Sequence, residues 1–176
     1  MIKRLFWIVC TALVALVLHL SYVLFMPGME MSNLIQRFAA AKGSNDLALL
    51  LPDEAHLFFK ADYPEMVTAA CAFDAAGGPV TIDAAIPDSY WTISIYAAGG
   101  ELLFTLDDRQ AGLDRMRFVI TSPGEEAPAS RDGEVITVQS PHESGLVLVQ
   151  ARAQEKALGP RLREAIAAST CGPRSQ

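Results

Sequence analysis

The hydrophobic pattern of this chain begins with an unbroken apolar run, Leu5 to Met26, preceded by Lys3 and Arg4 and followed by Pro27-Gly28. At about 1.5 Å per residue, a helix of this length covers roughly 33 Å, enough to cross a bilayer core of about 30 Å. A cleaved signal peptide has a shorter apolar core and small residues at its exit, whereas this run ends in bulky side chains. We therefore predict an uncleaved, single-pass membrane anchor over residues 1–28.

The charges that flank this run predict its orientation. Lys3 and Arg4 precede it, whereas Glu30 follows it and the next cation is Arg37. Because basic flanks stay on the cytoplasmic side, the N-terminus is expected in the cytoplasm and the remainder outside it.

The next region, residues 29–64, has a helical pattern only in its first half. Residues 29–43 place apolar side chains on one helical face, at Met31, Leu34, Ile35 and Phe38. This short amphipathic helix either lies in the headgroup layer or packs on the domain, and its few cations favour packing. Residues 45–64 form a connector whose secondary structure the pattern does not assign.

From Met66 onward, short runs of β-branched and aromatic residues alternate with turns rich in Gly, Pro and Asp. A mainly β domain, an antiparallel sandwich or barrel-like fold, is predicted over residues 65–176. A C-terminal helix is expected within 154–169, beginning in effect at Gly159-Pro160. A solvent loop is expected at 123–131 and a turn at Asp132-Gly133. The predicted strands are Val67–Asp74, Val80–Ile86, Tyr90–Ala97, Leu102–Leu106, Met116–Thr121, Val135–Gln139 and Leu146–Ala151.

The charge balance excludes one class of partner. The chain has 14 basic and 20 acidic residues; without Lys3 and Arg4, 12 basic residues remain against 20 acidic ones, a balance of −8 for the outer part. A nucleic acid is therefore not an expected partner, and anionic headgroups would repel this part of the chain. Only the apolar run, Leu5 to Met26, is expected to hold the protein to a membrane.

The three cysteines divide between the anchor and the outer part. Cys10 lies in the apolar run, and Cys71 and Cys171 lie 100 residues apart beyond it. In an oxidising space two such thiols predict a bridge, which restricts the unfolded chain by about 4 to 5 kcal/mol in the loop-entropy model. The alternative is a buried Cys71 and a free Cys171 in a frayed tail.

Candidate chemistry is sparse. Asp107, Asp108, Arg109 and His142 are the polar groups suited to acid–base work, although a turn with a local ion pair explains the first three more simply. Neither a nucleotide-binding nor a hydrolase motif occurs, and the histidines have no metal-ligand spacing, so no metal and no cofactor is predicted. Alternation places Tyr90, Thr92, Ser94 and Tyr96 on one strand face, which is either an ordinary wet surface or a binding surface.

Several segments resemble one known family. Residues 90–96, Phe104 and residues 107–111, together with residues 70–74, Pro87-Asp88, residues 145–148 and Cys171, resemble the short, membrane-anchored form of the family catalogued as domain of unknown function 1254. The resemblance implies a β-rich domain of the kind found as the N-terminal half of larger envelope proteins. It also implies a partner, a sister envelope protein of the companion family 1214. Because the family has no settled activity, the resemblance assigns no catalytic residue.

Three functional hypotheses follow. The leading one is a non-catalytic binding or assembly module that pairs with another envelope protein. It is expected in a bacterial inner membrane, with its N-terminus in the cytoplasm and its main domain in the periplasm. The alternative is an envelope enzyme acting on a glycan or lipid-linked substrate, with Asp107, Asp108, Arg109 and His142 gathered at one sheet end. A third possibility is a solute-binding domain that uses the Tyr90, Thr92, Ser94 and Tyr96 face.

Overall fold

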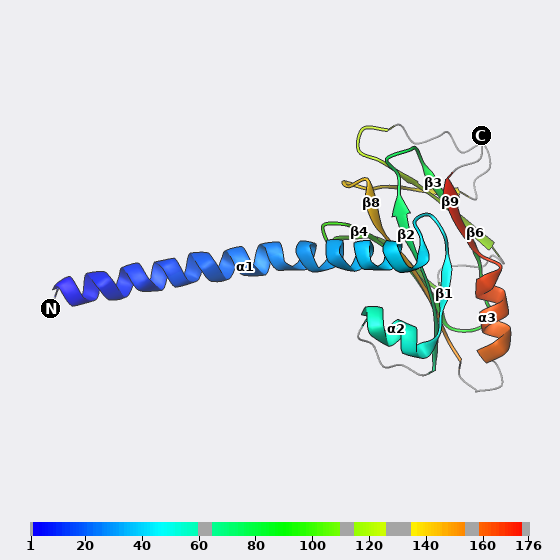
Figure 1. The fold of residues 1–176 in the computed structure, drawn as a ribbon, viewed down its shortest axis with the longest axis horizontal. Coiled ribbons are helices and arrows are strands. Elements are labelled where there is room, and N and C mark those ends of the chain that lie inside the picture. The colour runs from blue at the N-terminus through cyan, green and yellow to red at the C-terminus, as the bar shows by residue number, and fades with distance from the viewer. Residues whose placement is uncertain (1, 60–64, 110–114, 126–134, 154–158, 174–176) are drawn as a thin grey trace.

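The computed structural model describes residues 2–59, 65–109, 115–125, 135–153 and 159–173. They form a long N-terminal helix that leads into a β-sandwich with two short helices (Figure 1). The elements are α1 (Ile2–Lys42), β1 (Ala48–Leu50), α2 (Pro52–Phe59), β2 (Met66–Asp74), β3 (Val80–Ala85), β4 (Trp91–Ala97), β5 (Leu102–Asp107), β6 (Arg115–Thr121), β7 (Val135–Gln139), β8 (Ser144–Arg152), α3 (Gly159–Ala167) and β9 (Thr170–Pro173).

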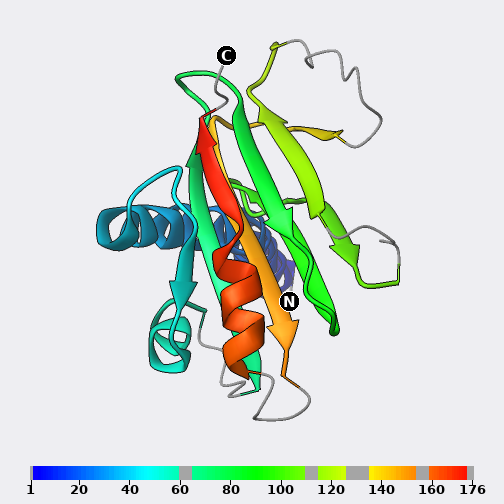
Figure 2. The same cartoon turned by 90° about the vertical axis from the view of Figure 1, so that its right-hand side faces the viewer.

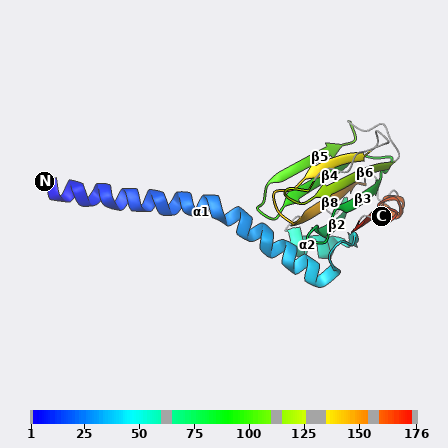
Figure 3. The same cartoon turned by 90° about the horizontal axis from the view of Figure 1, so that it is seen from above.

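Helix α1 is continuous over 41 residues and bends in its middle (Figure 3). Pro27 and Gly28, at the end of the predicted anchor, lie inside this helix, and the amphipathic helix predicted at residues 29–43 is its continuation. A proline in a helix interior removes one backbone hydrogen bond and bends the helix without necessarily ending it. Its N-terminal part is long and apolar enough to cross a membrane, and none of its most apolar window is buried against the protein.

The strands form a five-stranded sheet, in the order β1-β2-β8-β4-β5, and a four-stranded sheet, in the order β7-β6-β3-β9. Neighbouring strands are antiparallel except β6 and β7, which are parallel. In Figure 2, viewed from the end opposite the anchor, α3 and β9 lie in front of the strands. This arrangement confirms the predicted mainly β fold with an N-terminal helix and a C-terminal helix.

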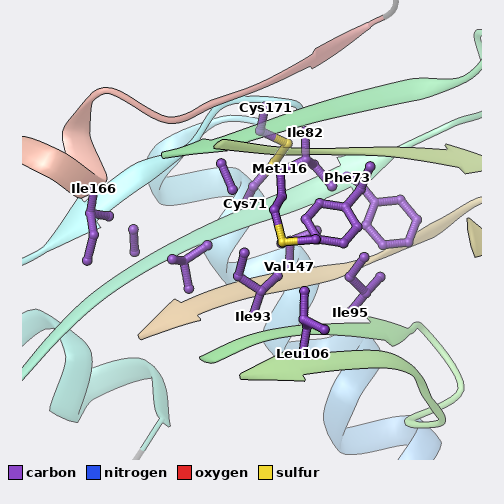
Figure 4. Close-up of a cluster of buried hydrophobic side chains, with 14 of the residues drawn as sticks. Cys71, Phe73, Ile82, Ile93, Ile95, Leu106, Met116, Val147, Ile166 and Cys171 are labelled. Atoms are coloured by element: carbon purple, nitrogen blue, oxygen red, sulfur yellow. A yellow bond between two sulfur atoms is a disulfide. The ribbon is translucent and has the colours of Figure 1, made fainter. Parts of the chain in front are cut away.

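One hydrophobic core lies between the two sheets. Its side chains come from alternate positions of both sheets, so that Ile82 of β3 and Ile93 of β4 are fully buried, and α3 adds Ile166. The predicted bridge is present: Cys71 of β2 and Cys171 of β9 join the two sheets with an Sγ–Sγ distance of 2.00 Å (Figure 4). Cys171 is therefore fixed in a strand, and the alternative of a frayed tail is wrong.

All seven predicted strands are present, with ends that differ by no more than two residues, and α3 begins at Gly159 as predicted. The structure adds β1, α2 and β9, which the pattern did not reveal. Met31, Leu34, Ile35 and Phe38 of α1 pack on the domain, the favoured of the two alternatives. The predicted turn at Asp132-Gly133, most of the loop at 123–131 and the start of the 154–169 segment lie outside the described residues.

Candidate functional site

The outer face of the five-stranded sheet, turned away from the sandwich core, is divided into two halves. On one half, small and apolar side chains of β2 and β8 receive the C-terminal part of α1 and the inner side of α2. Phe38 of α1 is fully buried there, and its ring centre lies 5.1 Å from that of Phe58 of α2. We call this half the covered face; its sheet side chains are Leu50, Ala70, Ala72, Leu146 and Leu148.

The other half carries polar and aromatic side chains from β4 and β5. Tyr90 is 40% exposed, and the Oγ of Ser94 lies 3.2 Å from the Oγ1 of Thr105 on the neighbouring strand. Helices α1 and α2 pack on the covered face and leave this half to solvent. We call it the open face; its residues are Tyr90, Thr92, Ser94, Tyr96, Thr105 and Asp107.

The open face contains all four residues predicted as a binding surface: Thr92, Ser94 and Tyr96 alternate along β4 as predicted, and Tyr90 lies directly before that strand. Trp91, Ile93 and Ile95 point the other way and are buried in the core. Thr105 and Asp107 were missed as members of this face, although each stands directly opposite a β4 residue, Ser94 and Thr92 respectively. The alternation within residues 104–107 was the signal that could have found them; before it the register shifts and places Leu102 opposite Tyr96.

The anchor and the domain meet where α1 crosses the turn between β4 and β5. The hydroxyl of Ser32 donates a 3.0 Å hydrogen bond to the carbonyl of Ala98 in that turn. Gly28 and Gly99 approach so closely that a Cβ on Gly28 would lie 3.0 Å from the Gly99 carbonyl oxygen. We call these contacts of Gly28 and Ser32 with the β4–β5 turn the anchor joint; they place that turn beside the end of the apolar segment.

A second contact fixes the far end of α1. Lys42 Nζ lies 2.7 Å from a carboxylate oxygen of Glu54, and the other oxygen of Glu54 accepts a hydrogen bond from the backbone N–H of Leu51. The hydrogen bond from Lys42, helped by that from Leu51, lowers the pKa of Glu54 from its ordinary value. Glu54 therefore starts α2 and ties it to α1.

The four residues proposed for an enzyme are not brought together. The backbone N–H of Asp108 donates to the carbonyl of Trp91 at the start of β4. The backbone N–H of Arg109 donates to a carboxylate oxygen of Asp107 at 3.1 Å, so residues 107–109 form an ordinary turn. His142 lies at the other end of the sheet, with its Nε2 3.9 Å from Glu101. Six residue steps of β4 separate these ends, about 20 Å at strand rise, so the four side chains do not share a site.

Another charged group lies on the outer face of the other sheet. Asp83 of β3 accepts hydrogen bonds from Arg115, at 2.8 Å, and Arg117, at 3.0 Å, on the neighbouring strand. Burial raises the pKa of Asp83, but the two arginines outweigh it and lower the pKa below its ordinary value. This pairing is a cross-strand ion pair of a structural kind. Within the described ranges, no three His, Cys, Asp or Glu side chains gather as metal ligands would, and the absence of a metal stays a prediction.

The chain is similar to solved structures and to one protein family, but not to a curated protein. No curated protein matches the chain. Among solved structures, it is similar to the VPA0106 protein from Vibrio parahaemolyticus, with a TM-score of 0.63 and 10% identity over 83% of this chain. It is also similar to a putative uncharacterized protein from Burkholderia cenocepacia, with a TM-score of 0.50 and 13% identity over 68% of this chain. At these identities the likeness shows the fold alone.

The matched part covers 35% of each of those two chains, so this protein spans about a third of their length. A family match covers residues 61–173, which include both sheets except β1 and the whole of the open face. The chain belongs to the family described as "Protein of unknown function (DUF1254)".

Proposed function

We propose that this protein is a single-pass inner-membrane protein whose β-sandwich stands in the periplasm as a binding or assembly module for another envelope protein. The apolar N-terminal part of α1 supports the membrane tether, and the Cys71–Cys171 bridge supports an oxidising compartment. Lys3 and Arg4 at the tip of α1 support a cytoplasmic N-terminus. The sister protein of family 1214 is the proposed partner.

The observation that carries the proposal is the division of one sheet face into a covered and an open half. Helices α1 and α2 bury the covered face, whereas the open face keeps Tyr90, Tyr96 and four small polar or acidic groups in contact with solvent. Tyrosine beside hydroxyl groups is typical of protein interfaces, because it adds area and hydrogen bonds at low entropic cost. The lengths of the similar solved structures also support a partner. About two thirds of each of those chains lies beyond the part that matches this protein, and a second protein could supply what corresponds to it.

The test is affinity purification of the full-length protein from membranes solubilised in mild detergent, followed by mass spectrometry. We expect a second envelope protein to co-purify with the wild type, and Ser94→Arg on the open face to reduce its yield by about tenfold, about 1.4 kcal/mol. Thr170→Arg is the matched control, because Thr170 is an exposed residue of β9 on the other sheet. Recovery of the wild-type protein alone would contradict the proposal.

The enzyme hypothesis is not carried forward, because Asp107, Asp108 and Arg109 lie at one end of the sheet and His142 at the other. A site that needs all four side chains has no place in this arrangement.

A further inference from the structure

Strand β5 is the edge of the five-stranded sheet in the described part of the chain, because it pairs only with β4. Edge strands in soluble domains are usually protected by lysine, proline or inward-pointing charge. Residues 102–106, Leu-Leu-Phe-Thr-Leu, contain none of these. Leu102 is 52% exposed, and Leu103 and Phe104 are partly exposed. The edge is thus apolar and open.

The hydrogen-bond register shows which backbone groups face outward. Asp108 N–H donates to Trp91 O, so Asp108 and Trp91 form a hydrogen-bonded pair. Leu106 and Phe104, at every second position of β5 before Asp108, stand opposite Ile93 and Ile95 of β4. In an antiparallel pair, residues alternate between those that bond to the partner strand and those that bond away from it. The N–H and C=O groups of Thr105 and Asp107 therefore point to the open edge, where no strand among the described residues bonds to them, although β7 of the other sheet lies nearby.

We propose that a strand from a different protein adds to β5 and so extends the five-stranded sheet. The inference deepens the proposed function, on which it rests, by naming the contact: backbone hydrogen bonds to Thr105 and Asp107, with the open face beside them as the adjoining interface. On the core side the added strand carries apolar side chains that cover Leu103 and Phe104, which are only partly buried. Acidic residues, Glu101 and Asp107, flank the apolar part of β5, so the added strand carries basic residues near its ends.

A second copy of this chain fits the edge poorly. Strand β5 starts at the anchor joint, where a Cβ on Gly100 would lie 3.3 Å from Pro27 O, and it runs away from the anchor (Figure 3). Two copies in one membrane, related by a twofold axis along the membrane normal, would bring their β5 strands together in the parallel sense. Parallel pairing is the less stable arrangement. The length of the similar solved structures also favours a separate polypeptide, since this chain spans about a third of them.

The first arm of the test removes one outward N–H. In Thr105→Pro the ladder to β4 keeps all its hydrogen bonds, because the N–H of Thr105 points away from β4. We expect it to retain about tenfold less partner than the wild type when the full-length protein is purified from solubilised envelope membranes, about 1.4 kcal/mol. Thr105→Ser is the matched control: it keeps both the N–H and the hydroxyl that contacts Ser94, and it is expected to bind as the wild type does.

The second arm needs no variant. Amide hydrogen exchange is compared between the isolated wild-type protein in detergent and the purified complex. Strand addition is expected to slow amide exchange at Thr105 and Asp107 by roughly tenfold or more. The exchange rates of Phe104 and Leu106, whose N–H groups already bond to β4, should change little. Slowing at all four positions, or at none, would overturn the inference, and so would a second copy of this chain as the sole protein recovered.

The outcomes separate this inference from the proposed function. A partner that binds the wild type and Thr105→Pro equally well, with Thr105→Pro folded, overturns strand addition and leaves the module in place. If Thr105→Pro fails to fold, the pattern of amide exchange in the wild-type complex decides whether a strand adds to β5. If no partner is recovered with the wild type, both the proposed function and strand addition fail.

Discussion

The covered face and the open face lie on the same side of the same sheet, yet their side chains differ in kind. Directly opposite pairs such as Ala70 and Leu148 are apolar where helices lie over them, whereas Ser94 and Thr105 are polar where the described helices do not. The change occurs between β8 and β4, within one strand spacing, about 4.8 Å. Where a sheet is buried on both faces, its strands lose the alternation of apolar and polar residues. The sequence of a strand therefore indicates whether its outer face is covered.

The largest effect is expected from the bridge beneath the covered face. Replacing Cys71 and Cys171 by serine together opens a 100-residue loop, and the free energy of unfolding should fall by about 4 to 5 kcal/mol. Urea unfolding of the full-length protein in detergent measures the loss, with Cys10→Ser as the control that should change nothing. A transition confined to the covered side would show that the two halves unfold as separate units, contrary to their shared core.

The next effect compares one aromatic residue from each half. Phe38→Ala should lower the free energy of unfolding by about 3 to 5 kcal/mol, because a fully buried ring is replaced by a cavity between α1 and the sheet. Tyr90→Ala on the open face should change it by about 0.5 kcal/mol or less. Both are measured by urea unfolding. Equal losses would mean that the open face is as tightly packed as the covered face, which would contradict their distinction.

A smaller effect is expected at Gly145, in β8 at the boundary between the halves. A Cβ there would overlap the carbonyl oxygen of Tyr96 and the ring of Phe73, so Gly145→Ala should cost about 1 to 3 kcal/mol. Gly77→Ala is the matched control, because a Cβ on Gly77 meets nothing within 4 Å and its backbone is not left-handed. Thermal unfolding of both variants would show whether the stability of the fold requires the close approach of Gly145 to Tyr96 and Phe73.

Much of this arrangement could be predicted from the sequence. Period-two alternation located seven strands and the Tyr90 to Tyr96 face, because each strand has at least one face with a single environment. Strands β1 and β9 are only three and four residues long, too short for a period to emerge, and they are held by pairing with distant strands. Tertiary contact, which a local pattern does not contain, decides such elements.

The same limit explains the candidate sites. The separation of His142 from Asp107 follows from the β4–β5–β8 pairing, which no motif spacing encodes. The continuity of α1 through Pro27 was also beyond local rules, because a proline followed by glycine usually marks a helix end. Contacts of the next turn with the domain, at Gly28 and Ser32, accompany the uninterrupted helix.

The smallest effect concerns how the covered face is held at low pH. The pKa of Glu54 is lowered in the folded protein, chiefly by the hydrogen bond from Lys42, so the ionised carboxylate stabilises the folded state. That stabilisation is present above the ordinary glutamate pKa, about 4.3, and is lost as the pH falls through the lower folded value. Thermal unfolding of wild type and Glu54→Gln between about pH 3 and 7 should show a wild-type advantage at neutral pH that disappears in acid.

Glu143→Gln provides the comparison, because Glu143 lies in the turn before β8, away from Lys42 and α2. Its difference from the wild type should be small and should not follow the pH dependence of Glu54→Gln. A Glu54→Gln deficit that stays constant into acid would assign the effect to side-chain shape, not to charge. Hydrogen exchange in α2 adds a local readout: because Glu54 bonds to Leu51 N–H and Lys42, acid should loosen α2 before it affects the open face.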